Sequence, residues 1–223
     1  IVLGLIMIPY AAYSRSNAIR VIKLYCRIVF TILKVLLKID LDIRGFIPEN
    51  TLAIICFKHQ SFLDVLMFLY ILPEPRFVMK TELNRIPIFS FYAKKIGCFS
   101  VQRDNKRSAL TALMETIKKE QGEISGQLVI YPEGTRTLPG EEVEYKKGIQ
   151  ILFSKLKRPL FLVSTNSGLT WPQRESFKYN GTASMNFIKK IEYTSKRFDI
   201  NVTIRKPIEN DSLRLYNLEK SRI

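Results

Sequence analysis

The sequence predicts an α/β fold: a mostly parallel or mixed sheet flanked by helices, preceded by a hydrophobic and amphipathic helical segment that binds a membrane. From residue 41 onward, short apolar runs of strand length alternate with helix-length stretches, which is the pattern of an α/β sheet. The 223 residues are 47% hydrophobic, enough for one domain with a single core. The first 40 residues instead mix apolar and basic side chains, so we divide the chain into residues 1–40 and an α/β domain at 41–223.

The chain starts with an apolar run, residues 1–13, which is too short to span a bilayer because a spanning helix needs about 20 residues. No methionine opens the sequence, so we expect its true start to be missing. The run can be the end of a longer hydrophobic segment, a piece that dips into one leaflet, or part of a signal peptide. The sequence leaves these interpretations open.

A second helix is predicted over residues 17–39, and it carries one basic ridge. Such a helix is typical of an element that lies in a membrane interface and binds anionic lipids, although packing on the domain with an ordinary solvated face is the alternative. We favour the membrane because no acidic residue interrupts the ridge before Asp40. The positive charges place the rest of the chain at the cytoplasmic face, and we expect a bacterial source. The ridge consists of Arg15, Arg20, Lys23, Arg27, Lys34 and Lys38.

The α/β domain is predicted from apolar runs bounded by polar or turn-forming residues, with proline interrupting one helical stretch. Its strands are the short apolar runs at residues 41–44, 51–57, 76–79, 98–101, 127–131, 160–164 and 182–187. Its helices are the stretches at residues 61–71, 83–96, 105–120, 146–156 and 212–218. Residues 198–205 alternate like a strand but can equally extend the last helix. The tail from about residue 188 is poorly assigned.

The composition narrows the kind of partner and the compartment. A net charge of +15 indicates an anionic partner: a membrane surface, a phosphorylated substrate or nucleic acid. Nucleic acid is least favoured, because zinc-finger and RRM signatures are absent and the basic residues lie beside apolar surface. Cys26, Cys56 and Cys98 lie far apart in apolar surroundings. They show neither metal-ligand spacing nor a disulfide framework, so we expect no metal site and a reducing environment.

Residues 58–64 hold the single histidine of the sequence. A strand-like run precedes them and a helical run follows, so His59 is predicted at a strand-to-helix corner, where α/β sheets usually bind ligands. Ser61 and Asp64 fit a capping box, which places Asp64 in the first helical turn and within reach of His59. The capping box alone also explains both residues without any chemistry, and a lone histidine is more often structural than catalytic.

Cations follow three other predicted strands. Lys80 follows one strand and Arg103 another. A third strand leads into the turn Pro132-Glu133-Gly134-Thr135-Arg136, where the glycine permits a tight turn and the guanidinium can bind a phosphate. Because the carboxyl ends of parallel strands lie at one edge of a sheet, these cations and His59 would form a pocket for a phosphorylated substrate.

These residues resemble the motifs of the glycerolipid acyltransferase family, and specifically of 1-acylglycerol-3-phosphate (lysophosphatidate) acyltransferases. That family has four ordered blocks: His-x4-Asp; a Lys-x-Glu-Leu and proline segment leading to a glycine, apolar residues and a basic residue; Pro-Glu-Gly-Thr-Arg; and an apolar strand ending in Asn-Ser-Gly. Each block alone is a weak indication of the family, but all four in order, over residues 51–172, are a strong one. The counterparts here are residues 59–64, residues 80–87 with 97–103, residues 132–136 and residues 159–168.

Two places depart from the family pattern. The residue before the histidine is often asparagine in the family and is Lys58 here, which would add a cation or perturb His59. The chain after Phe187 lacks the proline-rich segment that the family leads us to expect, and it reads Lys189-Lys190-Ile191-Glu192 instead. The C-terminal tail therefore has no family support.

The resemblance implies an enzyme that moves a fatty acyl group from a thioester of acyl carrier protein or coenzyme A to the free hydroxyl of lysophosphatidate, giving phosphatidate. It implies His59 as general base, Asp64 as the carboxylate that fixes its tautomer and stabilises the imidazolium, and no cofactor. It also implies a set of residues that hold the phosphate of the acceptor. These are Lys80, Arg103, Glu133, Gly134, Thr135 and Arg136.

Two alternatives to this function stay open at the level of sequence. Related acceptors, such as glycerol-3-phosphate or another lysolipid, would need only modest changes in the pocket. A lipid hydrolase with Ser61 or Cys98 as nucleophile is the nearest rival from another class, and the absence of a Gly-x-Ser-x-Gly motif counts against it.

Overall fold

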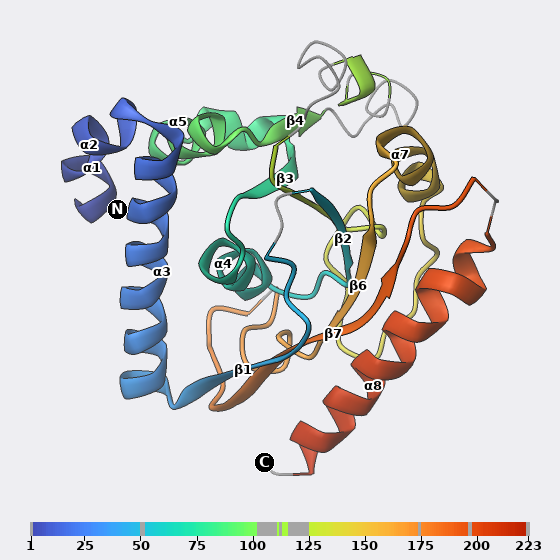
Figure 1. The fold of residues 1–223 in the computed structure, drawn as a ribbon. Helices are drawn as coiled ribbons and strands as arrows, with labels where there is room; N and C mark the ends of the chain where they lie inside the picture. The colour runs from blue at the N-terminus through green and yellow to red at the C-terminus, as the bar shows by residue number, and fades with distance from the viewer. Residues whose placement is uncertain are drawn as a thin grey trace.

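In the computed structural model, a seven-stranded sheet runs through the described residues in the order β1-β7-β6-β2-β5-β3-β4, with helices on both faces (Figure 1). The structure describes residues 2–49, 52–101, 111, 113–115, 125–173, 175–195 and 198–221. Neighbouring strands are parallel except β6 and β7, which are antiparallel. The predicted α/β class with a mostly parallel or mixed sheet is therefore confirmed.

The strands agree closely with the predicted apolar runs. They are β1 (Ile39–Gly45), β2 (Ala53–Phe57), β3 (Pro75–Lys80), β4 (Phe99–Val101), β5 (Gln127–Ile130), β6 (Leu160–Thr165) and β7 (Gly181–Ile191). The main difference is at β7, which continues beyond the predicted end at residue 187. It does so because β6 offers backbone partners as far as Ile191, while Lys189 and Lys190 keep their side chains exposed.

Three helices precede the sheet: α1 (Val2–Ile6), α2 (Ile8–Tyr13) and α3 (Arg15–Leu37). The predicted helix at 17–39 corresponds to α3, which begins after Ser14 because the Ser14 hydroxyl accepts a hydrogen bond from the Asn17 N–H (3.1 Å). In Figure 1 these helices stand beyond α4, at the left of the sheet. Among the described residues, no helix combines the length and the apolar character needed to cross a bilayer.

The remaining helices follow the predicted order with two changes. Pro87 starts a new helix, so the predicted segment 83–96 divides into the short turn η1 and α5. The interpretation of residues 198–205 as a strand is wrong, because residues 201–205 form a helical turn that leads directly into α8. The predicted helix 105–120 lies largely outside the described residues. The helices are α4 (Phe62–Ile71), η1 (Thr81–Arg85), α5 (Pro87–Ile96), α7 (Gly148–Leu156), η2 (Asn201–Arg205) and α8 (Lys206–Lys220).

The central strand β2 separates two apolar cores and ends at the candidate site. Ile54 and Cys56 pack toward α7 and α8, while Ile55 and Phe57 pack toward α3 and α4. This alternation follows from the two-residue period of a strand, and all five residues of β2 are buried. The chain therefore leaves the core at Phe57 and delivers the next residues to the carboxyl edge of the sheet, beside the ends of β5 and β6.

Candidate active site

His59 lies between the end of β2 and the start of α4, at the predicted strand-to-helix corner. The capping box of α4 is present: the Ser61 hydroxyl accepts a hydrogen bond from the Leu63 N–H (3.1 Å), and the Asp64 carboxylate accepts one from the Ser61 N–H (2.8 Å). The cap thus aims the Asp64 side chain backward, out of the helix and toward His59. It explains how two residues that are five positions apart come into contact.

The His59 Nδ1 lies 3.0 Å from Asp64 Oδ2. The same oxygen accepts hydrogen bonds from the Gln60 and Ser61 N–H groups, both at 2.8 Å, and the other oxygen accepts one from the Ser167 hydroxyl. Asp64 is fully buried, so these contacts hold the carboxylate in one orientation. Because a carboxylate can only accept, Nδ1 carries the hydrogen of the neutral ring and Nε2 keeps its lone pair.

The imidazole of His59 is reachable from solvent, with a side-chain exposure of 15%. It stacks on the Tyr131 ring, with 3.9 Å between the ring centroids and 19° between the planes. Its Nε2 forms no hydrogen bond with the residues that the structure describes. The arrangement leaves a free base at the surface of a fixed pair, which is what abstraction of a proton from a bound hydroxyl requires.

Glu133 contacts the backbone of the histidine from the neighbouring turn. Its Oε1 accepts a hydrogen bond from the His59 N–H (3.1 Å), and the Thr137 N–H donates to the His59 carbonyl (2.8 Å). Burial raises the pKa of Glu133 to about 8, although the hydrogen bonds to its carboxylate and the charge of Lys58 act in the opposite direction. This buried position favours a role in holding His59 over contact with a substrate phosphate.

The rest of the turn is suited to an anion. Gly134 has a positive φ of 74°, a backbone conformation that residues with a side chain rarely adopt, so glycine is favoured there. Thr135 is exposed and Arg136 is partly exposed. Arg136 forms no hydrogen bond or ion pair with any residue that the structure describes, so its guanidinium remains available to a ligand.

The other two predicted cations are placed differently. Lys80 is the last residue of β3, on the same sheet edge as His59 but two strands away, which corresponds to roughly 10 Å. Its ammonium is exposed and lies 3.0 Å from Glu82 Oε1. Arg103 lies outside the described residues. The structure thus brings His59, Asp64 and the 133–136 turn together and leaves Lys80 at the rim.

The fourth sequence block braces the first, which sequence reasoning did not assign. Besides the Ser167 contact to Asp64, the Gly168 N–H donates to the Gln60 side-chain oxygen (3.2 Å). The Ser61 hydroxyl in turn donates to the Trp171 carbonyl (2.7 Å). The motif itself was visible in the sequence, but its physical role becomes apparent only when β6 places it beside the His59 corner.

Lys58 does not supply a cation to the substrate side. It is buried and forms an ion pair with Glu209 of α8, on the sheet face opposite α4. Neither partner was assigned a structural role from sequence, because 151 positions separate them.

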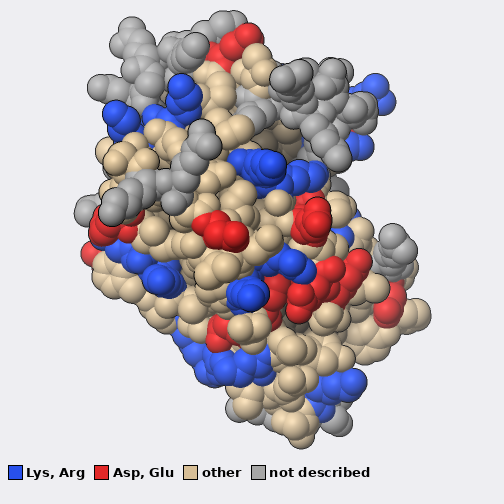
Figure 2. Space-filling view, turned by 90° about the vertical axis from the view of Figure 1, so that its right-hand side faces the viewer, with Lys and Arg blue, Asp and Glu red and all other residues tan. Residues whose placement is uncertain are grey.

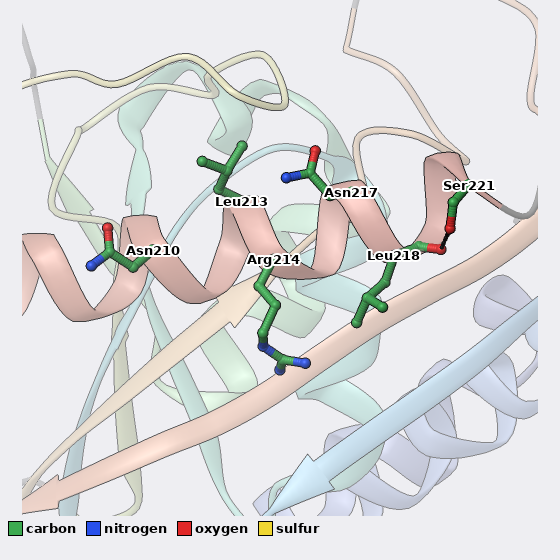
Figure 3. Close-up of a pocket in the computed structure, with 6 residues that line it drawn as sticks. All are labelled: Asn210, Leu213, Arg214, Asn217, Leu218 and Ser221. Carbon is green, nitrogen blue, oxygen red and sulfur yellow. Dashed lines mark hydrogen bonds between the residues drawn. The ribbon is translucent and has the colours of Figure 1, made fainter.

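Two surface hollows lie away from this corner. One, of about 590 Å³, follows a single face of α8 (Figure 3), and the other, of about 450 Å³, lies near the amino ends of β2 and β6. None of the predicted site residues lines either hollow. The first is lined by Asn210, Leu213, Arg214, Asn217, Leu218 and Ser221.

Comparison with known proteins agrees with the motifs and the fold. A family model described as Acyltransferase matches residues 38–165. A 1-acyl-sn-glycerol-3-phosphate acyltransferase of Pseudomonas aeruginosa is 27% identical over 182 residues, covering 79% of this chain and 67% of that protein. One of Cocos nucifera is 27% identical over 177 residues, covering 77% of this chain and 54% of that protein.

A solved structure shows the same fold. The crystal structure of the 1-acyl-sn-glycerophosphate acyltransferase PlsC from Thermotoga maritima superposes with a TM-score of 0.74 at 22% identity, covering 90% of this chain and 80% of that one. The overall fold of this chain is therefore one already observed by experiment.

Proposed function

The chain belongs to the acyltransferase family, and we propose that it transfers a fatty acyl group from a thioester donor to the free hydroxyl of lysophosphatidate, which gives phosphatidate. The observation that carries the proposal is a His59–Asp64 pair with a free Nε2 beside a turn whose Arg136 is unpaired among the described residues. The names of the two curated relatives support this acceptor. The donor is a thioester of acyl carrier protein or of coenzyme A.

The geometry suggests that the acyl group passes directly from the thioester to the acceptor hydroxyl, without an acyl-enzyme. His59 Nε2 takes the proton of the acceptor hydroxyl while that oxygen attacks the thioester carbonyl carbon. The tetrahedral intermediate collapses with cleavage of the carbon–sulfur bond, and the imidazolium returns the proton to the leaving thiolate. Asp64 stabilises the imidazolium through the 3.0 Å contact to Nδ1 and prevents the ring from rotating.

Neither of the two nucleophiles considered for the hydrolase alternative, both among the described residues, is suited to form a covalent acyl-enzyme. The Ser61 hydroxyl is buried and already engaged as the cap of α4 and as a donor to the Trp171 carbonyl. Burial raises the pKa of the Cys98 thiol to about 11, which disfavours the thiolate, and its side chain packs against apolar clusters. These contacts favour attack by the acceptor itself and disfavour the hydrolase alternative.

The phosphate of the acceptor is expected to bind at the 134–136 turn. Arg136 supplies a planar guanidinium that can donate two hydrogen bonds to one phosphate, and the exposed Thr135 can add a hydroxyl donor. Lys80 at the rim provides longer-range attraction, since its charge is shared with Glu82. The proposed contacts place the glycerol hydroxyl on the His59 side and the phosphate on the Arg136 side.

A product assay with the purified protein tests this function. We expect phosphatidate from lysophosphatidate with coenzyme A or acyl carrier protein thioesters, and no turnover by His59→Ala. Arg136→Ala removes the free guanidinium, so it should raise the KM for lysophosphatidate by about tenfold or more and leave the donor KM unchanged.

Parallel reactions with glycerol-3-phosphate, a neutral lysolipid and water as acceptors provide the comparison. Esterification of one of these in preference to lysophosphatidate, or release of free fatty acid with accumulation of acylated protein, would overturn the proposal. A folded His59→Ala variant with full activity would refute the role of the base.

We further propose that residues 1–40 attach the catalytic domain, residues 41–223, to the cytoplasmic face of a membrane containing anionic lipids. On α3 the side chains of Leu24, Ile28, Ile32, Val35 and Leu36 are exposed and fall on one face. The basic ridge of α3 lies next to that face, as expected for an interfacial helix. On the opposite side of the molecule, acidic and basic side chains of the described residues are intermixed (Figure 2).

A further inference from the structure

A buried ion pair joins the catalytic corner to the C-terminal helix. Lys58 is 1% exposed and Glu209 of α8 is 6% exposed, and the ammonium contacts Glu209 Oε2 directly. Lys58 is the residue immediately before His59, so whatever fixes its side chain also fixes the end of β2. Removing two charges from water is costly, and a buried pair therefore adds little net stability. A role in fixing the position of the backbone at the end of β2 is the better reason for such a pair here.

Both members of the pair also hold the loop that carries the phosphate turn. The Lys58 ammonium donates a second hydrogen bond to the Glu141 carbonyl (2.8 Å), and the Tyr145 hydroxyl donates to Glu209 Oε1 (3.0 Å). The loop is closed at its base by a hydrogen bond from the Lys146 N–H to the Pro132 carbonyl (3.0 Å). The ion pair thus contacts the loop at Glu141 and Tyr145, while the backbone of His59 contacts it at Thr137.

Glu133 gives an independent sign that this pair acts on the turn. Its carboxylate is buried, and its Oε2 has no hydrogen-bond partner among the described residues. The charge of Lys58 favours the ionised form of Glu133, and that of Glu209 opposes it. A change in either charge of the pair therefore acts on the ionisation of Glu133, the side chain that accepts the His59 N–H.

We propose that the Lys58–Glu209 pair is a clamp that holds the 132–145 loop against the end of β2 and so keeps Arg136 in register with His59. The inference rests on the proposed function, because the phosphate of the acceptor is the group that this register would serve. Lys58 and Glu209 are positioning residues, since neither reaches the substrate side. Through this clamp, helix α8 contributes to acceptor binding.

The test uses a variant that removes both charges and keeps the packing. Lys58→Met/Glu209→Gln leaves no unpaired buried charge, and the amide introduced at position 209 can still accept from the Tyr145 hydroxyl. The matched control is Arg205→Met/Glu142→Gln, which removes an exposed ion pair (2.9 Å) between the same loop and the turn that leads into α8. Both variants are made in the full chain.

Two readouts are taken: KM values for both substrates, and hydrogen exchange at amides of the loop. In the clamp variant we expect an acceptor KM raised by about tenfold or more, because a small misplacement of a binding group is costly, with the donor KM unchanged. Exchange at the Thr137 and Lys146 amides should accelerate in the clamp variant alone. In an Arg136→Ala background, the clamp substitutions should no longer change the acceptor KM.

The two readouts separate the clamp from the proposed function. Unchanged exchange in the loop overturns the clamp whatever the assay gives, and so does an equal rise in both KM values or the same effect in the control variant. A wild-type protein that does not acylate lysophosphatidate, but whose loop loosens in the clamp variant, overturns the proposed function and retains the clamp.

Discussion

At the scale of single residues, the two oxygens of Asp64 have different partners and different consequences. Oδ2 contacts the imidazole and two backbone N–H groups, whereas Oδ1 is held by the Ser167 hydroxyl. The carboxylate is buried, so loss of the Ser167 hydroxyl would leave Oδ1 as an unsatisfied charged oxygen, whereas Oδ2 would keep its own partners. Ser167 is thus expected to act on catalysis through Asp64, although it does not touch the imidazole.

Removing the Ser167 hydroxyl tests this indirect role. Hydrogen bonds to charged groups contribute about 1.5–3 kcal/mol, so Ser167→Ala should lower kcat by about 10- to 100-fold and leave both KM values nearly unchanged. In an Asp64→Ala background the same substitution should have no further effect on the residual rate. The measurement is a double-mutant cycle on kcat.

Thr170→Val is the control for the Ser167 prediction, because the Thr170 hydroxyl is buried nearby and donates to the Ser167 carbonyl (3.2 Å) without touching Asp64. It should leave kcat close to the wild-type value. Additive effects of Ser167→Ala and Asp64→Ala, or an equal loss in Thr170→Val, would show that Ser167 acts through general packing.

Local sequence signals predicted the pair but not its surroundings. The His59–Asp64 contact could be predicted because a capping box spans only four residues and fixes the side chain of its last member. The contacts of Asp64 with Ser167 and of Lys58 with Glu209 span 103 and 151 positions. No local pattern encodes such contacts, since they depend on which strands lie side by side in the finished sheet.

At the scale of elements, the spacing of apolar residues located the strands of the sheet. It failed where a segment fits both the two-residue period of a strand and the 3.6-residue period of a helix. Residues 198–205 alternate like a strand, but no neighbouring strand pairs with them among the described residues, and they continue into α8 as a helical turn. The antiparallel pairing of β7 with β6 could not be predicted either, because the sequence of a strand does not indicate its direction relative to its neighbours. The order of elements in the core, by contrast, followed from the alternation of apolar runs.

The apolar face of α3 leads to an element-scale prediction. Val35 and Leu36 are 69% and 72% exposed, so replacing both by serine removes apolar surface without opening a cavity. We expect Val35→Ser/Leu36→Ser to weaken binding to vesicles rich in anionic lipid by about tenfold, in line with about 0.8 kcal/mol per buried methylene. Thermal stability should not change. Vesicle co-sedimentation measures the effect.

Leu213→Ser/Leu218→Ser is the matched control, because both leucines are exposed on α8, on the other side of the molecule (Figure 1). Vesicle binding should be unaffected in this control. If both double variants bind equally well, or lose binding to the same extent, α3 is not the membrane-binding element.

At the scale of the whole molecule, the net charge of +15 predicted an anionic partner but not where that partner binds. On the face covered by α7 and α8, side chains of both signs lie together (Figure 2). Other acidic side chains of α8 serve as structural partners. Glu209, Glu219 and Asp211 all hold backbone or side-chain donors in this part of the fold. Composition alone does not distinguish such structural charges from those that face a ligand.

Glu133 couples the stability of the folded protein to pH. Burial raises its pKa to about 8 in the folded state, whereas an unfolded chain has the ordinary value of about 4.3. Between these two values the folded state binds more protons than the unfolded state, so the free energy of unfolding falls as the pH rises. The contribution of this group is fully present below the unfolded pKa and is lost as the pH passes about 8.

Substituting Glu133 by glutamine removes this titration and keeps an oxygen that can accept the His59 N–H. We therefore expect the melting temperature of the wild type to fall more than that of Glu133→Gln when the pH rises from about 5 to about 8.5. Glu144→Gln, at an exposed position in the same loop, should follow the wild type. If the melting temperatures of the wild type and Glu133→Gln fell equally over this pH range, the Glu133 carboxyl would be shown to ionise normally. A buried, protonated Glu133 would then no longer account for how the turn is held against His59.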